Sequence, residues 1–184
     1  MRGCTYVDSA WFLYHVPGFL LALEVSRDRL SHQMSDDIER IEQLAHNLRS
    51  VLEAVPRQDL PVGMRSFPKG ACGNSAILLG AYFANYEIEG FVYVQGRRGS
   101  REQNTRASHA WLARETLVVD ITADQFSDAP GPVIVADPSP WHQTFRTKEY
   151  TDPGDRGILW NRFGIDELYR LYNRLHTSLF PSST

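Results

Sequence analysis

The chain has 184 residues, of which 42% are hydrophobic, enough for one domain with a buried core. Its 19 Lys and Arg residues against 22 Asp and Glu residues give a formal net charge of −3, and no long basic tract is present, so nucleic acid is not an expected partner. The two cysteines, Cys4 and Cys72, lie in no zinc-binding pattern. We therefore expect a reduced, cytoplasmic protein that uses neither a metal nor another cofactor.

Residues 1–34 are interpreted as an N-terminal arm or an extension that precedes the domain. Their apolar run is interrupted by His15 and Pro17, and Glu24 follows it at once. The run is too short and too broken to span a bilayer, and it is followed by no clear signal-peptide cleavage site. No membrane partner is therefore expected, and a single domain is predicted over residues 35–184.

A helix is predicted to begin at Ser35, an N-cap residue type that is followed by two acidic residues. Arg49 is expected on its polar side and His46 in solvent, and Pro56 ends it. The apolar side recurs at steps of three and four residues and comprises Ile38, Ile41, Leu44, Ala45, Leu48, Val51, Leu52 and Val55.

The segment Gly70–Ser75 follows a loop in which Phe67 is a probable anchor, and it opens a second helix that runs to about Tyr86. A cysteine in the first helical turn lies beside unpaired backbone N–H groups and the positive end of the helix dipole, and both stabilise a thiolate. Cys72 is therefore the candidate nucleophile. Asn74 is expected to cap this helix rather than to contact substrate.

Four strands are predicted downstream, and a C-terminal helix follows them over residues 165–179. The strands cover residues 91–95, 108–113, 116–121 and 133–136. Between the first two, Arg97, Arg98, Arg101 and Arg106 cluster in a polar loop, which we interpret as solvated, with contact to an acidic substrate as the alternative.

The second and third predicted strands carry the candidate base and acid. If the turn between them is centred on Arg114-Glu115, as a loop of either two or four residues, paired residue numbers sum to 229 and His109 lies opposite Asp120. The four-residue loop is favoured, because Arg-Glu lacks the Gly or Asn that a two-residue turn prefers. Opposed residues share a face, so the carboxylate could accept a hydrogen bond from the imidazole. With a loop of odd length, Asp124 becomes the alternative orienting acid.

Gly70-Ala71-Cys72, Ser108-His109-Ala110-Trp111 and Val118-Val119-Asp120 together resemble the Cys-His-Asp core of the transglutaminase-like branch of the papain-like superfamily. This group includes transglutaminases, bacterial cysteine proteases, peptide amidases and deamidases, lasso-peptide leader peptidases and arylamine N-acetyltransferases. The resemblance covers residues 67–145. It implies an α+β fold in which a central nucleophile helix packs on a small antiparallel sheet, with additional N- and C-terminal helices.

By residue, the resemblance implies Cys72 as nucleophile, His109 as base and acid, and Asp120 as the group that orients the histidine. The Cys-Gly-Ser-Cys-Trp type of segment found around the nucleophile of papain itself is absent. The candidates for substrate binding or for the oxyanion hole are Gln125, Trp141, Trp111 and Asn74. His142 is interpreted as a surface histidine, with a contact to substrate as the alternative.

The predicted function is a thiol-dependent hydrolase or acyl transferase that acts on a peptide or side-chain carboxamide through a thioester, with protease, amidase or deamidase activity favoured. The predicted partner is a protein or peptide substrate, or a small amide. Two alternatives remain: acyl transfer of the arylamine N-acetyltransferase type, and a catalytically inactive binding or effector module.

Overall fold

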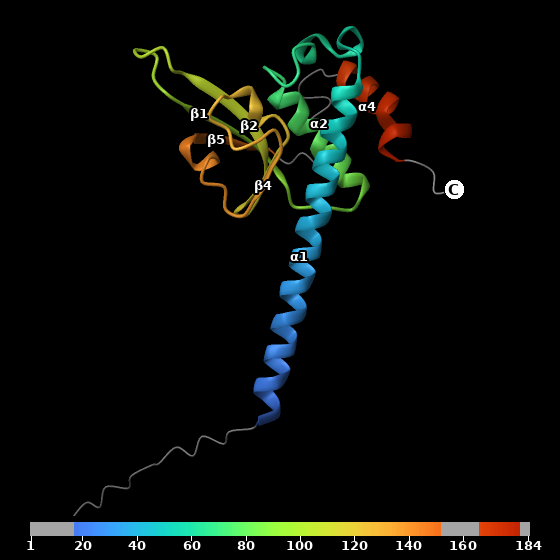
Figure 1. The fold of residues 1–184 in the computed structure, drawn as a ribbon, viewed down its shortest axis with the longest axis vertical. Coiled ribbons are helices and arrows are strands. Elements are labelled where there is room, and N and C mark those ends of the chain that lie inside the picture. The colour runs from blue at the N-terminus through green and yellow to red at the C-terminus, as the bar shows by residue number, and fades with distance from the viewer. Residues whose placement is uncertain (1–16, 152–165, 181–184) are drawn as a thin grey trace, which may run out of the picture. The chain divides into compact units, whose positions relative to one another are not determined.

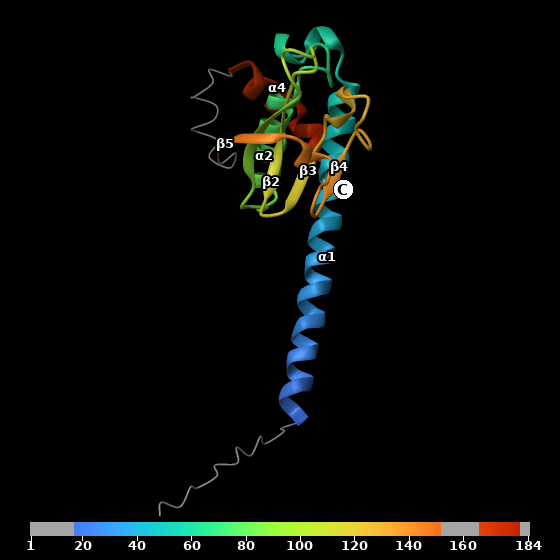
Figure 2. The same ribbon diagram turned by 90° about the vertical axis from the view of Figure 1, so that its left-hand side faces the viewer.

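The computed structural model describes the backbone of residues 17–151 and 166–180, and side chains within residues 34–146 and 166–180, except residue 177. The described chain is α+β, with helices beside an antiparallel sheet (Figures 1 and 2). It divides into two compact units, Met1–Asp37 and Ile38–Thr184. Cys4 lies outside the described residues.

Helix α1 covers Pro17–Ala54 and crosses the boundary between the two units. The predicted start at Ser35 is wrong, because the helix already begins at Pro17, a residue type that suits the first helical position. The predicted end is confirmed: the helix stops at Ala54, ahead of Pro56. No helix among the described residues is both long and apolar enough to cross a bilayer.

One core joins three helices in the second unit. Helix α2 covers Cys72–Asn85, and helix α4 covers Asp166–Leu179. Every residue of α2 from Ser75 to Phe83 is buried, which explains why this segment is apolar all round. The core residues of α1 and α4 recur at helical spacing and are Ile41, Leu44, Ala45, Leu48, Leu52, Leu168, Leu171, Tyr172, Leu175 and Leu179.

The sheet has five antiparallel strands in the order β4-β3-β2-β1-β5. The four predicted strands are confirmed. The fifth was not predicted, because its sequence is polar and charged and shows no clear alternation. The strands are β1 (Val92–Arg98), β2 (Ala107–Arg114), β3 (Leu117–Asp120), β4 (Ile134–Ala136) and β5 (Arg146–Thr151).

The two faces of the sheet carry different cores, because side chains alternate along each strand. Leu112 and Val119 face the core shared with α2, whereas Trp111, Val118 and Phe145 belong to a second, aromatic cluster. Gly96 makes room for this cluster: a Cβ atom there would lie 2.6 Å from the Trp111 ring. Since Gly96 pairs with His109, the aromatic cluster begins beside the candidate base.

Candidate active site

Cys72 is the first residue of α2, and it is the cysteine that the described part of the chain contains. Burial, the largest influence, raises the pKa of the Cys72 thiol. The hydrogen bond and charge of His109 lower it, as do the backbone N–H groups of Ala110 and Gly73, and together they hold the pKa below its ordinary value. The helix start and strand β2 therefore both stabilise a thiolate at this position.

His109 and Asp120 form a buried ion pair behind the thiol, and their side chains are almost inaccessible to solvent. The Nε2 atom of His109 lies 2.6 Å from Oδ2 of Asp120. Burial lowers the pKa of His109, but Asp120 and Cys72 outweigh it and raise the pKa to about 9. The pKa of Asp120 falls to about 2, because hydrogen bonds from His109 and His142 outweigh burial. An ionised carboxylate only accepts, so Nε2–H donates and Nδ1 is left to face the thiol.

The predicted register between β2 and β3 is wrong by two residues. The observed pairs, such as Arg114 with Leu117 and Leu112 with Val119, have numbers that sum to 231, so the turn is centred on Glu115-Thr116 rather than on Arg114-Glu115. Because Arg114 pairs with Leu117, the turn has two residues instead of the favoured four. Glu115 adopts a φ of 56° in this turn, although it is not glycine. The shift is even, so His109 and Asp120 still share a face and meet as a diagonal pair rather than as opposed residues.

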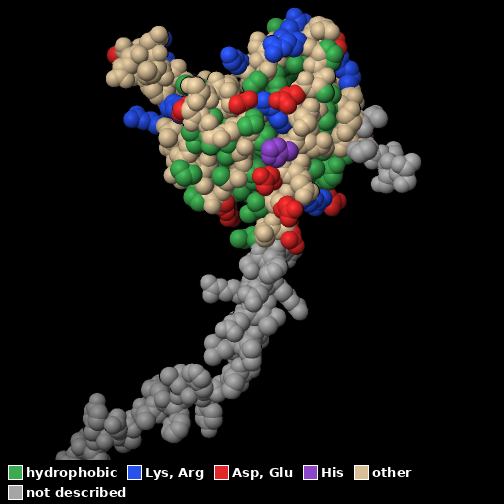
Figure 3. Space-filling view, viewed as in Figure 1, with side chains coloured by type: hydrophobic (Ala, Val, Ile, Leu, Met, Phe, Trp, Pro, Cys, Tyr) green, Lys and Arg blue, Asp and Glu red, His purple; other side chains and the backbone are tan. Residues whose placement is uncertain are grey.

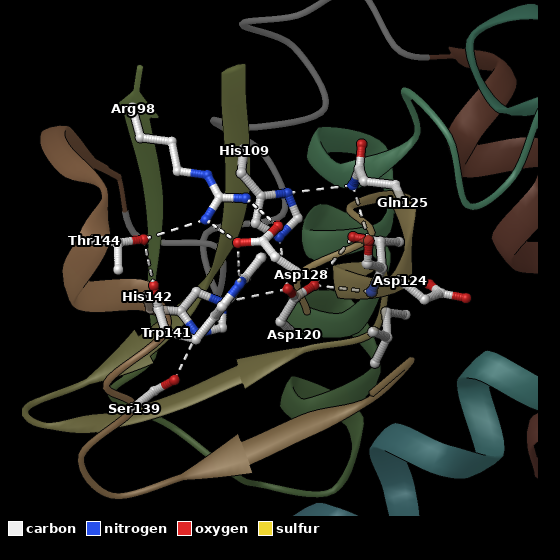
Figure 4. Close-up of polar contacts among 12 residues, drawn as sticks. Arg98, His109, Asp120, Asp124, Gln125, Asp128, Ser139, Trp141, His142 and Thr144 are labelled. Atoms are coloured by element: carbon white, nitrogen blue, oxygen red, sulfur yellow. Dashed lines mark hydrogen bonds and ion pairs between the residues drawn. The ribbon is translucent and has the colours of Figure 1, made fainter. Parts of the chain in front are cut away.

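Asp120 is held by more donors than the sequence indicated. Its Oδ1 atom accepts hydrogen bonds from the backbone N–H (2.8 Å) and hydroxyl (3.0 Å) of Thr122. Its Oδ2 atom also lies 3.2 Å from Nε2 of His142, and Nδ1 of His142 lies 2.7 Å from the hydroxyl of Ser139 (Figure 4). Four donors therefore fix both oxygens of the carboxylate that orients His109.

His142 is not the surface histidine that was predicted, because it is only 3% exposed. Burial lowers its pKa, which favours the neutral imidazole. With Nε2–H donating to Asp120, Nδ1 must accept, and the hydroxyl of Ser139 is its donor. This burial could not be predicted from the sequence, since His142 lies in a short 3₁₀ turn, η4 (His142–Thr144), that has no periodic pattern.

Gln125 is the one predicted binding candidate whose polar group reaches the base. It ends the short 3₁₀ helix η3 (Ala123–Gln125), which follows β3. Its Nε2 atom donates to the carbonyl of Thr122 at 2.9 Å and lies 3.2 Å from Nδ1 of His109. Its Oε1 atom accepts from the backbone N–H of Gly70 at 3.3 Å. The amide therefore links the loop before Cys72 with the imidazole (Figure 4).

Trp111 and Trp141 enclose His109 instead of offering it polar groups. Both indole rings lie 5.7 Å from the imidazole centroid, and Phe126 lies 5.1 Å from it. The Trp141 indole N–H donates to Asp128 at 3.2 Å, and Asp128 also pairs with Arg98 (Figure 4). This aromatic wall keeps water from the His109–Asp120 pair.

The predicted capping role of Asn74 is wrong: the N-cap residue of α2 is Ala71, and no side chain makes the capping bond. Asp124 was the alternative orienting acid for a turn of odd length, but the turn has two residues. Both oxygens of Asp124 instead accept hydrogen bonds from Arg49 at 2.8 Å.

Arg49 was predicted on the polar side of its helix, but its side chain is only 7% exposed. Its guanidinium group also donates to the carbonyl of Ile121 at 2.8 Å and lies 4.9 Å from the centre of the Phe67 ring. Phe67 itself is buried, as its predicted anchor role requires. Arg49 thus joins α1 to the loop before Cys72 and to the segment that carries Asp124.

The described residues contain one group with the composition of a metal site, His109, Asp120 and His142, whose ligand atoms lie within 4.8 Å of one another. In the structure both histidine Nε2 atoms face the same carboxylate oxygen. Metal binding through these atoms would require both nitrogens to lose their protons. The arrangement described here is a hydrogen-bonded network.

Comparison of the chain with protein-family models, with curated proteins and with solved structures finds no match.

Proposed function

We propose that this chain is a cysteine hydrolase or acyl transferase that attacks a peptide or side-chain carboxamide, with hydrolysis as the favoured outcome. The observation that carries the proposal is the placement of Cys72 at the start of α2, where His109 lowers the thiol pKa, together with Asp120 held 2.6 Å from that histidine. Each residue has the role that thiol catalysis needs: a thiolate at a helix start, an imidazole beside it, and a carboxylate that fixes the ring.

We further propose that the α+β fold is a papain-like core of the transglutaminase-like type. The nucleophile begins a buried helix, and the base and the acid lie on neighbouring antiparallel strands packed beside that helix. This order and layout are those implied by the sequence resemblance. The proposal extends to the core, residues 67–145, and leaves helix α1 outside it.

The resting site is proposed to be an ion pair of the Cys72 thiolate and the His109 imidazolium, in line with the lowered thiol pKa and the raised imidazole pKa. The sulfur attacks the carbonyl carbon, the C–N bond breaks, and the leaving nitrogen takes the Nδ1 proton. A thioester on Cys72 remains. His109 then removes a proton from water, the hydroxide attacks the thioester, and the thiol and a carboxylic acid are released. An amine in place of water would give acyl transfer.

Two donors are placed to stabilise the oxyanion in each addition step. The N–H of Cys72 is among those that the first turn of a helix leaves without an intrahelical acceptor. The second is the amide of Gln125, which stands 3.2 Å from Nδ1 of His109. When Nδ1 is protonated it no longer accepts, so this amide N–H becomes available to the negative oxygen of the substrate.

The test is the rate at which iodoacetamide alkylates Cys72, measured against pH by mass spectrometry of the Cys72 peptide. An active pair reacts well below the ordinary cysteine pKa of about 8.5, and His109→Ala moves the profile up toward that value. Folding of each variant is checked by circular dichroism. A Cys72 profile that follows an ordinary thiol and ignores His109→Ala would reject the enzyme and favour the inactive binding module.

The reaction class is then separated with candidate donors. Incubation with an unfolded protein such as reduced casein, followed by intact-mass analysis, should show peptide-bond cleavage or a mass gain of one unit per deamidated side chain, both lost in Cys72→Ala. Acylation of Cys72 that depends on acetyl coenzyme A would instead support transfer of the arylamine N-acetyltransferase type.

A further inference from the structure

The loop between β1 and β2 encloses, with the start of β5, a cavity of about 730 Å³ whose charged lining is almost entirely cationic. Figure 3 shows this loop as a lobe that projects from the body, with Lys or Arg side chains beside it. Among the described side chains, the lining arginines are Arg97, Arg101, Arg106 and Arg146, and the lining carboxylate is Glu102. Three of the four come from the cluster noted in the sequence. Arg98 belongs to the same sequence cluster but does not line the cavity, because its guanidinium group pairs with Asp128.

The positive charge of this cavity is not balanced within the described part of the chain. Arg97 lies directly opposite Arg146 in the β1–β5 register, and like charges in opposed positions are destabilising. Among the described side chains, the ion pairs involve none of the four arginines. The carboxylate of Glu102 accepts a hydrogen bond from the hydroxyl of Ser100. A chain with a net charge of −3 thus keeps a local cationic excess.

The loop that carries Arg101 and Arg106 is held by its own hydrogen bonds. The backbone N–H of Thr105 donates to the carbonyl of Ser100, and the N–H of Ser100 donates to the hydroxyl of Thr105, both at 3.0 Å. Gly99 adopts a φ of 78°, and a Cβ atom there would lie 2.1 Å from the Thr105 carbonyl oxygen. A loop ordered in advance presents its arginines with less entropy to lose on binding.

We infer that this cavity binds acidic side chains of the polypeptide substrate. The inference rests on the proposed function, because it takes the bound polypeptide to be the substrate. Guanidinium groups suit carboxylates, because two parallel N–H donors match two oxygens. Arg97 pairs with Ser108, the residue before His109, so the cavity is built on the same two strands, β1 and β2, that flank the candidate base. Among the described side chains, none that lines the cavity is aromatic and could stack a base, which favours a peptide over a nucleic acid.

The test is fluorescence anisotropy with fluorescein-labelled octaglutamate and Cys72→Ala protein, which binds without turnover. Octaglutamate should bind, octalysine should not, and binding should weaken as NaCl is added. Arg101→Glu with Arg106→Glu should weaken binding by about tenfold or more. The control carries the same charge change at two exposed arginines elsewhere, Arg57 of η1 (Arg57–Asp59) and Arg170 of α4, and should stay within about twofold of the parent.

An equal loss of octaglutamate affinity in the test and control variants would overturn the inference, because the peptide would then respond only to the net charge of the protein. Tighter binding of an octathymidine oligonucleotide than of octaglutamate would overturn it in favour of a nucleic acid. Failure of this inference is distinct from failure of the proposed function. The alkylation profile of Cys72 tests the latter, and Arg101→Glu with Arg106→Glu should leave that profile unchanged.

Discussion

The residues that do the proposed chemistry differ in how visible they are from the sequence. Cys72, His109 and Asp120 could be chosen because each residue type has a chemical role and each lies at a recognisable place, a helix start or a strand. His142 could not, since a histidine in a turn shows no period and its burial depends on Trp111 and Trp141 packing against it. Buried partners of a catalytic acid are set by tertiary packing, which residue type does not encode.

Removing the His142 side chain should disturb the triad without touching the thiol. His142→Ala takes one donor from Asp120 and leaves the Ser139 hydroxyl without its acceptor. We expect the free energy of unfolding to fall by about 2 kcal/mol, and alkylation of Cys72 at pH 7 to slow by about tenfold as the carboxylate loses its fixed orientation.

The matched variant is His142→Gln, whose amide N–H can still donate to Asp120 and which should recover much of the alkylation rate. Urea unfolding and iodoacetamide kinetics measure the two effects. If His142→Ala and His142→Gln both react at the rate of the parent protein, the second histidine does not orient the acid.

At the scale of elements, the sequence predicts which segments are strands better than it predicts which residues pair between them. Four strands follow from β-branched and aromatic residues, but the pairing of β2 with β3 depends on Glu115 adopting a positive φ, which the residue type does not favour. The face of Asp120 was nevertheless predicted correctly, because a shift of two residues preserves the alternation of side chains. The polar strand β5 lacked any such signal.

The contact between Arg49 and Asp124 should matter more for stability than the other ion pair of the same arginine. Arg49→Met leaves Asp124 without its partner and the carbonyl of Ile121 without a donor. We expect the free energy of unfolding to fall by about 2 to 3 kcal/mol, less than for a fully buried pair because Asp124 is 32% exposed.

The control is Glu53→Gln, which removes the other carboxylate that pairs with Arg49, at 2.7 Å. Since the Glu53 side chain is 52% exposed, we expect a change of about 0.5 kcal/mol or less. Urea unfolding of the two variants provides the comparison. An equal effect of both substitutions would show that Arg49 does not fasten the segment after β3.

At the scale of the whole molecule, helices packed on an antiparallel sheet follow from composition and periodicity, whereas the second, aromatic cluster on the other face of the sheet does not. The length of α1 does not, because Ser35 and the acids after it form a helix-start pattern inside a continuous helix. Capping signals predict where a helix could begin, and only the residues before them decide whether it already has.

The ion pair at the site also determines how the stability of the whole molecule depends on pH. The pKa of His109 is raised to about 9 from 6.5, so its contribution is complete below pH 6.5 and is lost as the pH rises through 9. The lowered pKa of Cys72 acts in the opposite direction, because the folded thiol releases its proton at a lower pH than the unfolded thiol, whose pKa is about 9. If the folded thiol is ionised, as the proposed ion pair requires, one proton gained and one released leave the folded and unfolded chains with equal proton counts.

The parent protein should therefore show little contribution from the site to the pH dependence of unfolding between about pH 6.5 and 8.5. Cys72→Ser removes the thiol and leaves His109 paired with Asp120, so its stability should fall by about 1 to 3 kcal/mol over the same range. The double variant Cys72→Ser with His109→Gln is the reference, because it keeps all other titratable groups. Subtracting its pH profile from those of the parent and of Cys72→Ser leaves the contribution of the site. Urea unfolding at several pH values measures each variant. A slope in the parent as steep as in Cys72→Ser would mean that the thiol keeps its proton and that Cys72 and His109 form no ion pair.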